Sequence, residues 1–240
     1  MLKRQWIAVW LLMAGLPIAA ATEPESALQP VARQTRQDAE QRFYLSGIVG
    51  ASFGTLMVDA PPSANEPLFT SGGALGIEFD RPWRLEFEGR ARDPIGAVQE
   101  GSDTTTSFSA TGGWSAMVNL WRDIPVTERL GLYVGGGIGG GGYRFTLAGD
   151  SPPPVDVTLQ AASIVNSFAW QAGTGLAYAW TDRITFDLGY RFFALDGGNV
   201  DVLQSISGVP YGSFTANTGF SASELFVAVR IYEPFRALRR

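Results

Sequence analysis

Charged and apolar residues alternate over the stretch RLEFEGRAR, residues 84–92. Side chains of a β-strand point alternately to its two faces, so all the charges of this stretch share one face and the apolar side chains share the other. The charged residues are Arg84, Glu86, Glu88, Arg90 and Arg92. A strand of this kind separates two very different environments, but the alternation alone does not tell which face meets lipid, water or a core.

The same period of two recurs along most of the chain and predicts eight strands. They are expected at residues 43–53, 71–79, 84–92, 108–121, 129–145, 167–180, 184–193 and 223–232. A tilted strand crosses a bilayer in about 9–11 residues, and each predicted strand is long enough to do so.

The connections between these strands alternate between long and short. Long connections are predicted at 54–70, 93–107, 146–166 and 194–222, and short ones at 80–82, 122–128 and 181–183. The short ones contain turn residues such as Asp80, Pro82 and Pro125. Short turns at one end and long loops at the other are typical of outer-membrane barrels. The sequence therefore predicts an all-β fold, an eight-stranded antiparallel transmembrane β-barrel with up-and-down meander topology over residues 42–235, with both termini periplasmic and a short tail at 236–240.

The residue types on the two faces indicate which one meets lipid. The apolar face carries aromatic residues near the strand ends: Trp83, Trp114, Trp170, Tyr178, Trp180 and Tyr190. Aromatic residues gather at the two interfaces of a membrane. The opposite face is rich in Gly, Ala, Ser and Asn, which fit the narrow interior of an eight-stranded barrel. The charges of RLEFEGRAR are thus expected to point inward, and Leu85 and Phe87 to meet lipid.

The first 21 residues have the features of a secretory signal peptide. Lys3 and Arg4 precede an apolar run, and Ala19–Ala21 offers a cleavage site. Residues 22–41 are then a polar, flexible periplasmic leader. Without the two basic residues of the signal, the net charge is 16 − 23 = −7, which argues against nucleic acid as a partner. The chain contains no cysteine, and therefore no disulfide or thiol chemistry.

Two longer runs resemble a known family. The runs NLWRDIPVTERLGLYVGGGIG (119–139) and FAWQAGTGLAYAWTDRITFDLGYRFF (168–193) are similar to the small eight-stranded outer-membrane β-barrel proteins of Gram-negative bacteria, the opacity-type proteins and the transmembrane domain of outer membrane protein A. The resemblance implies a location in the outer membrane, with lipid and lipopolysaccharide as surroundings. It also implies insertion by the barrel assembly machinery, for which Tyr232 or Phe235 would supply the usual C-terminal aromatic signal.

The inward face carries equal numbers of acidic and basic residues. They are Glu78, Arg84, Glu86, Glu88, Arg90, Arg92, Asp187, Arg191, Glu224 and Arg230. Arginine is suited to bidentate pairing with carboxylates, so the set predicts a salt-bridged plug that fills the lumen. The alternative is a gated ion path, in which Glu88 exchanges partners between Arg191 and Arg230. Catalytic use of paired carboxylates is a third and weaker reading.

Enzymatic activity is not expected. The chain has no histidine, the side chain best suited to general base catalysis near neutral pH. The glycine run GGGIGGGG (135–142) lacks the GK[ST] ending of a phosphate loop and falls within a predicted strand. Neither a nucleophile elbow nor a set of metal ligands is recognisable, so no cofactor and no dedicated metal site are predicted.

The long connections carry acidic residues and no basic ones. The acidic residues are Asp59, Glu66, Asp93, Glu100, Asp103, Asp150, Asp156, Asp196 and Asp201. Simple solvation of exposed loops explains them, and so does attraction of divalent cations that tie the loops to lipopolysaccharide, or of a basic partner. The last connection, 194–222, also carries apolar residues, which are compatible with a hairpin that extends beyond the membrane and also with a recognition surface. We therefore expect a structural or surface-interaction role, with a small gated channel as the alternative and a lipid-modifying enzyme as a remote third.

Overall fold

The computed structural model describes residues 41–58, 64–79, 82–100, 105–151 and 156–234. The predicted signal peptide, the C-terminal tail and all but the last residue of the predicted leader lie outside these ranges. Among the described residues no helix is long and apolar enough to cross a membrane.

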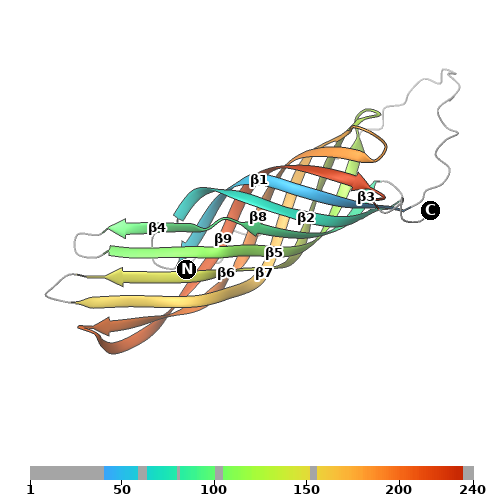
Figure 1. Ribbon diagram of the computed structural model, residues 1–240. Helices are drawn as coiled ribbons and strands as arrows, with labels where there is room; N and C mark the ends of the chain where they lie inside the picture. Colours follow the sequence, from blue (N-terminus) through green and yellow to red (C-terminus); the bar gives the residue numbers. More distant parts are fainter. Residues whose placement is uncertain (1–40, 59–63, 80–81, 101–104, 152–155, 235–240) are drawn as a thin grey trace, which may run out of the picture. The chain divides into compact units, whose positions relative to one another are not determined.

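The described chain consists of β-strands that follow one another in an antiparallel meander (Figure 1). Their bounds are β1 (Arg42–Val58), β2 (Ala64–Glu78), β3 (Trp83–Arg92), β4 (Ile95–Glu100), β5 (Thr105–Pro125), β6 (Leu130–Asp150), β7 (Val157–Ala179), β8 (Ile184–Ile206) and β9 (Val209–Tyr232). Pairing of β1 with β9 closes the ring. Both β3 and β4 pair with β5, one after the other, so β4 continues the position of β3. The ring therefore passes through eight strands, and the predicted fold is confirmed.

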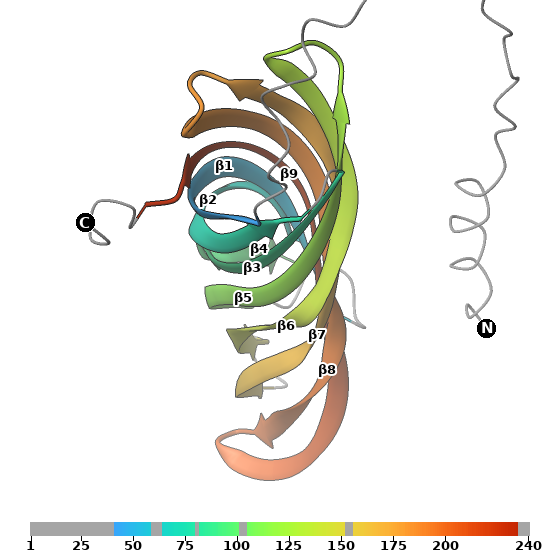
Figure 2. The same cartoon turned by 90° about the vertical axis from the view of Figure 1, so that its right-hand side faces the viewer.

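Three short turns lie at one end of the barrel, between β2 and β3, between β5 and β6, and between β7 and β8. We call this end, at the right of Figure 1, the turn end, and the opposite end the long end. Figure 2 looks onto the turn end and shows the strands curving around a common axis.

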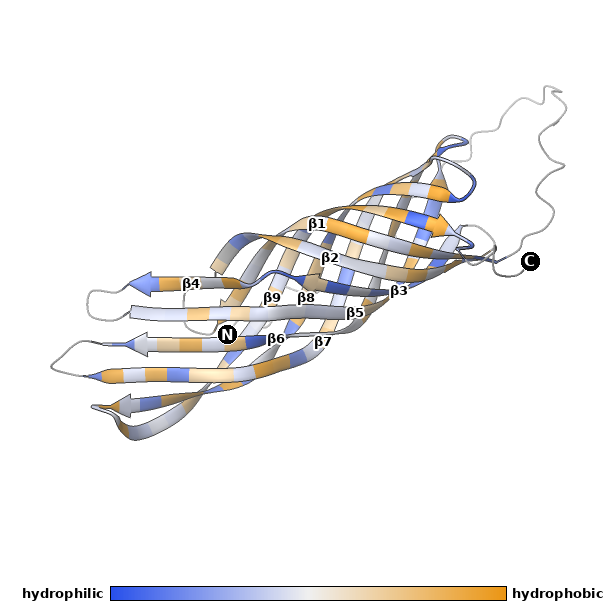
Figure 3. Cartoon of the chain, viewed as in Figure 1, coloured by the Kyte–Doolittle hydropathy of each residue, from blue (hydrophilic) through white to orange (hydrophobic). Residues whose placement is uncertain are grey.

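The strands extend much further toward the long end than the sequence predicted. Most of the residues expected in the four long loops belong to strands, for example the whole of β4 and the last part of β8. The predicted long connections are therefore shorter than expected, because these segments keep the period of two with Ser, Thr, Asn and Gly in place of charged residues. Figure 3 shows polar and apolar residues alternating up to the long end.

The inward-facing phase of three strands changes near the middle of the barrel. Arg92 at the end of β3 is buried, and so is Ile95 at the start of β4. The two residue numbers differ by three, and in a regular strand an odd difference places side chains on opposite faces. In β5 the change coincides with Gly112, whose φ of 63° interrupts the ladder with β6. In β8 it coincides with the register shift between Leu195 and Gly198. A bulge adds one residue and so moves every later side chain to the other face.

A two-residue turn joins β8 and β9 at the tip of their hairpin. Ser207 and Gly208 both have positive φ, 50° and 76°, and Ile206 pairs with Val209. This geometry matches the right-handed twist of the flanking strands, and glycine adopts it without steric cost. The connection 194–222, for which the sequence left two interpretations open, is thus a long hairpin.

Candidate functional site

Nine of the ten charged side chains predicted to face inward are buried in the barrel. They are Arg84, Glu86, Glu88, Arg90, Arg92, Asp187, Arg191, Glu224 and Arg230. Leu85 and Phe87, their neighbours on β3, are exposed on the outer surface. Glu78 is half-buried near the turn end, directly across from Arg42 and Arg84 in the strand register.

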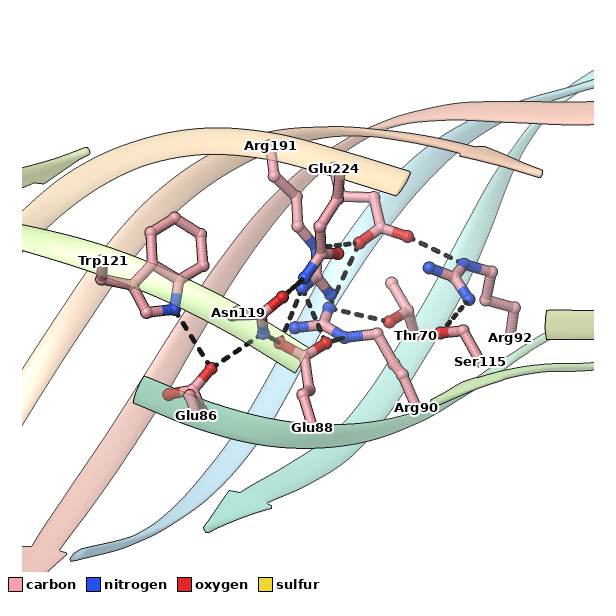
Figure 4. A network of polar contacts seen from close by, with 11 residues as sticks. Thr70, Glu86, Glu88, Arg90, Arg92, Ser115, Asn119, Trp121, Arg191 and Glu224 are labelled. Atoms are coloured by element: carbon pink, nitrogen blue, oxygen red, sulfur yellow. Dashed lines mark hydrogen bonds and ion pairs between the residues drawn. The ribbon is translucent and has the colours of Figure 1, made fainter. Parts of the chain in front are cut away.

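Two glutamates and three arginines form the centre of this interior, which we call the charged layer (Figure 4). Arg191 donates from Nη1 to both oxygens of Glu88, at 2.7 and 2.9 Å, and from Nε to Glu224 at 2.6 Å. Glu224 also accepts from Arg92 Nε at 2.9 Å and from Arg90 Nη1 at 3.3 Å. Arg90 Nε donates to Glu88 at 3.0 Å. The two carboxylates thus lie between guanidinium groups that come from β3 and β8.

Uncharged side chains extend the charged layer toward the turn end. Asn119 on β5 donates to both Glu86 and Glu88, at 3.2 and 3.3 Å. Its own oxygen accepts from Gln171 at 2.6 Å. Trp121 and Tyr44 donate to Glu86 (3.3 and 2.9 Å). These uncharged partners of the glutamates were not predicted, because only charged residues were assigned to the interior network. Each of them nevertheless lies at an inward-facing position of its strand.

A second group of charges lies near the turn end. Arg230 on β9 binds Asp187 on β8 through two hydrogen bonds of 2.7 Å. Arg84 donates to Asp123 at 2.6 Å. Asp123 was expected in a short connection outside the lumen, but β5 extends to Pro125 and brings this carboxylate to Arg84. Of the two partners suggested for Glu88, Arg191 contacts it, whereas Arg230 is bound to Asp187.

Glycines in the barrel wall make room for these large side chains. A Cβ on Gly137 would collide with Asn119, and one on Gly175 or Gly189 would collide with the hydroxyl of Tyr133. The glycine run of β6 is therefore explained by close approach of neighbouring side chains and backbone, as expected for glycine in a strand interior.

The charged layer holds more positive than negative charge. Three arginines face two glutamates, and Nη2 of Arg90, Arg92 and Arg191 has no hydrogen-bond partner among the described residues. The rings of Phe193 and Phe226 lie close to these groups, with the Arg92 guanidinium carbon 3.9 Å from the Phe193 centroid. Cation–π contacts of this kind compensate part of the lost hydration.

On the long-end side of the charged layer, the interior of the barrel is apolar. We call this cluster the apolar layer; its larger members are Leu56, Leu68, Ile95, Phe108, Tyr143, Phe145, Val165, Phe193, Leu195, Val200, Val202 and Phe220. Phe145 and Val202 are 0% exposed. Tyr143 satisfies its hydroxyl by a 2.9 Å hydrogen bond to Thr218. Among the described residues, the apolar layer covers the charged layer on its long-end side.

The outer surface of the long end mixes polar cross-strand pairs with exposed apolar residues such as Val98, Leu203 and Tyr211, in contrast to the apolar outer surface nearer the turn end. Ser109 pairs with Thr146 across β5 and β6 at 2.8 Å. Across β8 and β9, Thr215 donates to Asp201 at 2.9 Å, and Asn217 donates to Asn199 at 3.2 Å. Such cross-strand pairs are typical of a sheet face in water. Nearer the turn end, the outward positions carry apolar residues such as Phe87, Val118, Ile138, Leu188 and Val227.

The acidic residues predicted in the loops lie mainly on or beside strands of the long end. Asp59 and Asp103 are outside the described residues. The others are all exposed: Glu66 on β2, Asp93 between β3 and β4, Glu100 at the end of β4, Asp150 at the end of β6, Asp156 before β7, and Asp196 and Asp201 on β8. Within the described ranges, no group of three or more acidic side chains is close enough to hold a metal ion.

A family model supports the class of protein that this architecture defines. Residues 8–212 match the outer membrane protein beta-barrel domain. The chain belongs to this family, and it is an outer-membrane β-barrel protein.

The individual proteins that match this chain share limited sequence identity with it. An uncharacterised protein of Brucella abortus is 34% identical over 89 residues, which are 36% of this chain and 31% of that protein. The matched region thus spans about a third of the length of that relative. Outer membrane protein PagN of Salmonella typhimurium is 24% identical over 185 residues, covering 70% of this chain and 74% of PagN.

Solved structures with a similar fold are small outer-membrane barrels. Neisserial surface protein A is 15% identical, with a TM-score of 0.45, and the match covers 79% of this chain and 96% of that protein. Ail, the attachment invasion locus protein of Yersinia pestis, is 14% identical, with a TM-score of 0.38 and coverage of 78% and 98%.

Proposed function

We propose that this protein is a surface-interaction protein of the outer membrane, whose barrel is closed and whose long end faces outward and contacts partners. The observation that carries the proposal is the stacking of two different layers in the interior. A layer of paired charges fills the lumen where the outer surface is apolar, and a layer of buried apolar side chains covers it. Ions would have to pass both, and dewetted apolar constrictions oppose ion passage.

The long end is the surface that remains for function. Its strands project beyond the apolar outer band, its outer surface mixes polar and apolar residues, and its seven described acidic residues are exposed. Placing the long end outside the cell agrees with the general rule that short turns of such barrels are periplasmic. An acidic surface attracts basic partners or divalent cations that also bind lipopolysaccharide phosphates. We propose no enzymatic role, which is supported by the absence of histidine from the whole chain.

Single-channel recording of the refolded protein in a planar bilayer tests the closed barrel. Heat-modifiable gel mobility first verifies that the sample is folded. We expect no conductance steps above the bare bilayer. The matched variant Phe145→Ala opens space in the apolar layer only, and the variant Arg191→Ala opens space in the charged layer only. Reproducible steps in the unmodified protein would refute the closed barrel.

The alternative, a small gated channel, has one observation in its favour. Three buried guanidinium groups carry an Nη2 without a partner among the described residues, so the charged layer has unused donors that water or an anion would satisfy. If this alternative holds, neutralising Glu88 or Arg191 changes the conductance and the ion selectivity of the open state.

A further inference from the structure

Strand β9 leaves one of its edges open near the tip of the β8–β9 hairpin. β9 pairs with β8 as far as the turn, at Val209 with Ile206, but its pairing with β1 ends at Thr218 with Val58. Beyond Thr218, no described residue pairs with β9 on the β1 side. The hairpin lies at the margin of the extended sheet, at the lower left of Figure 1.

Residues 209–215, which we call the open edge, lie beyond the end of the β1–β9 ladder at Thr218 and have no strand partner on that side among the described residues.

The open edge is exposed on both faces. All residues from Val209 to Thr215 are exposed, and they include Val209 at 65%, Tyr211 at 73% and Phe214 at 48%. Unpaired strand edges promote association with other strands, and proteins usually protect them with charges, prolines or bulges. Here Pro210 and the register shift beside Ser205 protect only the tip. Every second amide of Gly212–Thr215 points away from β8 and stays available for a further strand.

The composition of this region is that of a recognition surface. No charged residue occurs between Asp201 and Glu224, and Ser, Gly, Thr and aromatic residues dominate. Tyr, Ser, Gly and Asn are the residues that binding loops use for adaptable contacts. The single nearby charge is Asp201, which accepts a hydrogen bond from Thr215 of the open edge. The wider surface of the long end is acidic.

We infer that the open edge binds an extended, basic segment of a partner protein, which adds a strand beside β9. Main-chain hydrogen bonds would supply the affinity, as in other cases of strand addition. Tyr211 and Phe214 would contact alternate side chains of the added strand. A lysine or arginine of that strand, opposite Thr215, would reach over β9 to Asp201, across two strand spacings of about 4.8 Å each. The acidic surface favours a basic partner over a second copy of this acidic chain. The inference rests on the proposed surface-interaction function and specifies its partner.

Amide hydrogen exchange of the full chain in lipid nanodiscs tests this inference. The probe is a nine-residue peptide in which lysine and valine alternate. At saturation, we expect exchange within residues 209–215 to slow at least about tenfold, while exchange in the β1–β9 ladder stays unchanged. Asp201→Asn should weaken the peptide two- to fivefold, as expected for a charge pair at the rim of an interface.

Three matched peptides show whether a strand is added. One has glutamate in place of lysine, and the other two keep every lysine but carry N-methyl groups on every second amide, one in each alternation. We expect no protection of the open edge by the glutamate peptide, which is repelled, or by the peptide whose methyl groups face β9, which cannot complete a ladder. The other N-methylated peptide keeps its donors toward β9 and should protect the edge.

Three results would overturn the inference: no protection by the basic peptide, equal protection by both N-methylated peptides, or protection that depends on protein concentration without peptide. The last result would assign the edge to a second copy of the chain. A silent bilayer recording together with any of them would leave the proposed function standing and remove only this inference.

Discussion

The two halves of the barrel obey the same alternation with opposite polarity. In the half that holds the charged layer, buried Arg, Glu and Asp face the interior, and residues such as Phe87 and Leu188 face outward. At the long end, Phe145, Val200 and Val202 face the interior, and Asp201, Thr215 and Asn217 face outward. The first half has the polarity of a membrane barrel, whereas the interior of the second half is apolar. We expect the boundary of the membrane to lie along the strands where this polarity changes.

One position in the ring shows the contrast directly. β3 and β4 follow one another along β5, with Asp93 and Pro94 between them. The inward side chains of β3 are charged, whereas Ile95, the first inward side chain of β4, is apolar and 3% exposed. Lipid requires an apolar outer surface, which leaves the polar groups for the lumen. Water allows the opposite, and the hydrophobic effect then fills the interior.

The largest expected effect concerns the charged layer. Glu224→Gln removes the carboxylate that holds Arg90, Arg92 and Arg191. Arg90 and Arg191 then share Glu88, and Arg92 loses its ion-pair partner. Breaking a buried ion pair by removing one partner costs about 3–5 kcal/mol. Urea unfolding of the barrel in lipid vesicles, followed by gel mobility, measures the change in the free energy of unfolding.

The matched control is Asp201→Asn, which neutralises an exposed carboxylate of the long end. We expect a change within about 0.5 kcal/mol, since surface substitutions have small effects. If both variants unfold at the same urea concentration, the charged layer does not stabilise the barrel and the contrast between the halves fails.

The second effect concerns the apolar layer. Phe145→Ala empties the space of a side chain that is 0% exposed, and such core truncations cost about 3–5 kcal/mol. Because partial collapse of the site lowers this cost, we expect it in the lower part of the range. The same unfolding assay measures it. Stability within about 1 kcal/mol of the unmodified protein would mean that the long end is not packed as a core.

The third effect locates the membrane boundary. Phe87→Arg and Leu203→Arg both place an arginine at an outward position that is now apolar and exposed, by 57% and 61%. An arginine facing the middle of the bilayer costs about 2–4 kcal/mol, falling to about 0–1 near the interfaces. We therefore expect Phe87→Arg to be destabilising and Leu203→Arg to be nearly neutral. Equal costs would contradict a boundary between these two positions.

The smallest effect concerns the seam between β7 and β8. Their ladder is interrupted between Gln160 and Ala169, whereas β7 keeps continuous pairing with β6 over the same length. Amides of residues 161–168 that face β8 should exchange faster with solvent than those that face β6, because local opening there breaks no strand pairing. Hydrogen exchange resolved by residue shows this as alternate fast and slow amides. Uniform protection along the segment would contradict an open seam.

Much of the fold could be predicted because the lipid environment imposes strict rules on sequence. RLEFEGRAR predicts which face of β3 points inward, since its charges cannot face lipid. The arginine partners of Glu88 and Glu224 could not be assigned, because all but Arg90 of Glu88 come from other strands, 33 to 134 residues away in the sequence. Asn119, Tyr44 and Asp123 were missed because uncharged residues and turn residues carry no signal of their own until the ring closes.

The sequence by itself determined the class of protein, the strand order and the inward direction of the charges, because each follows from the period of two and from apolar residues that must meet lipid. The tertiary structure alone decided how far the strands continue and that the interior changes from charged to apolar. The reason is that bulges near Gly112 and Gly198 shift the inward phase, and only strand pairing shows on which face the next residue lies.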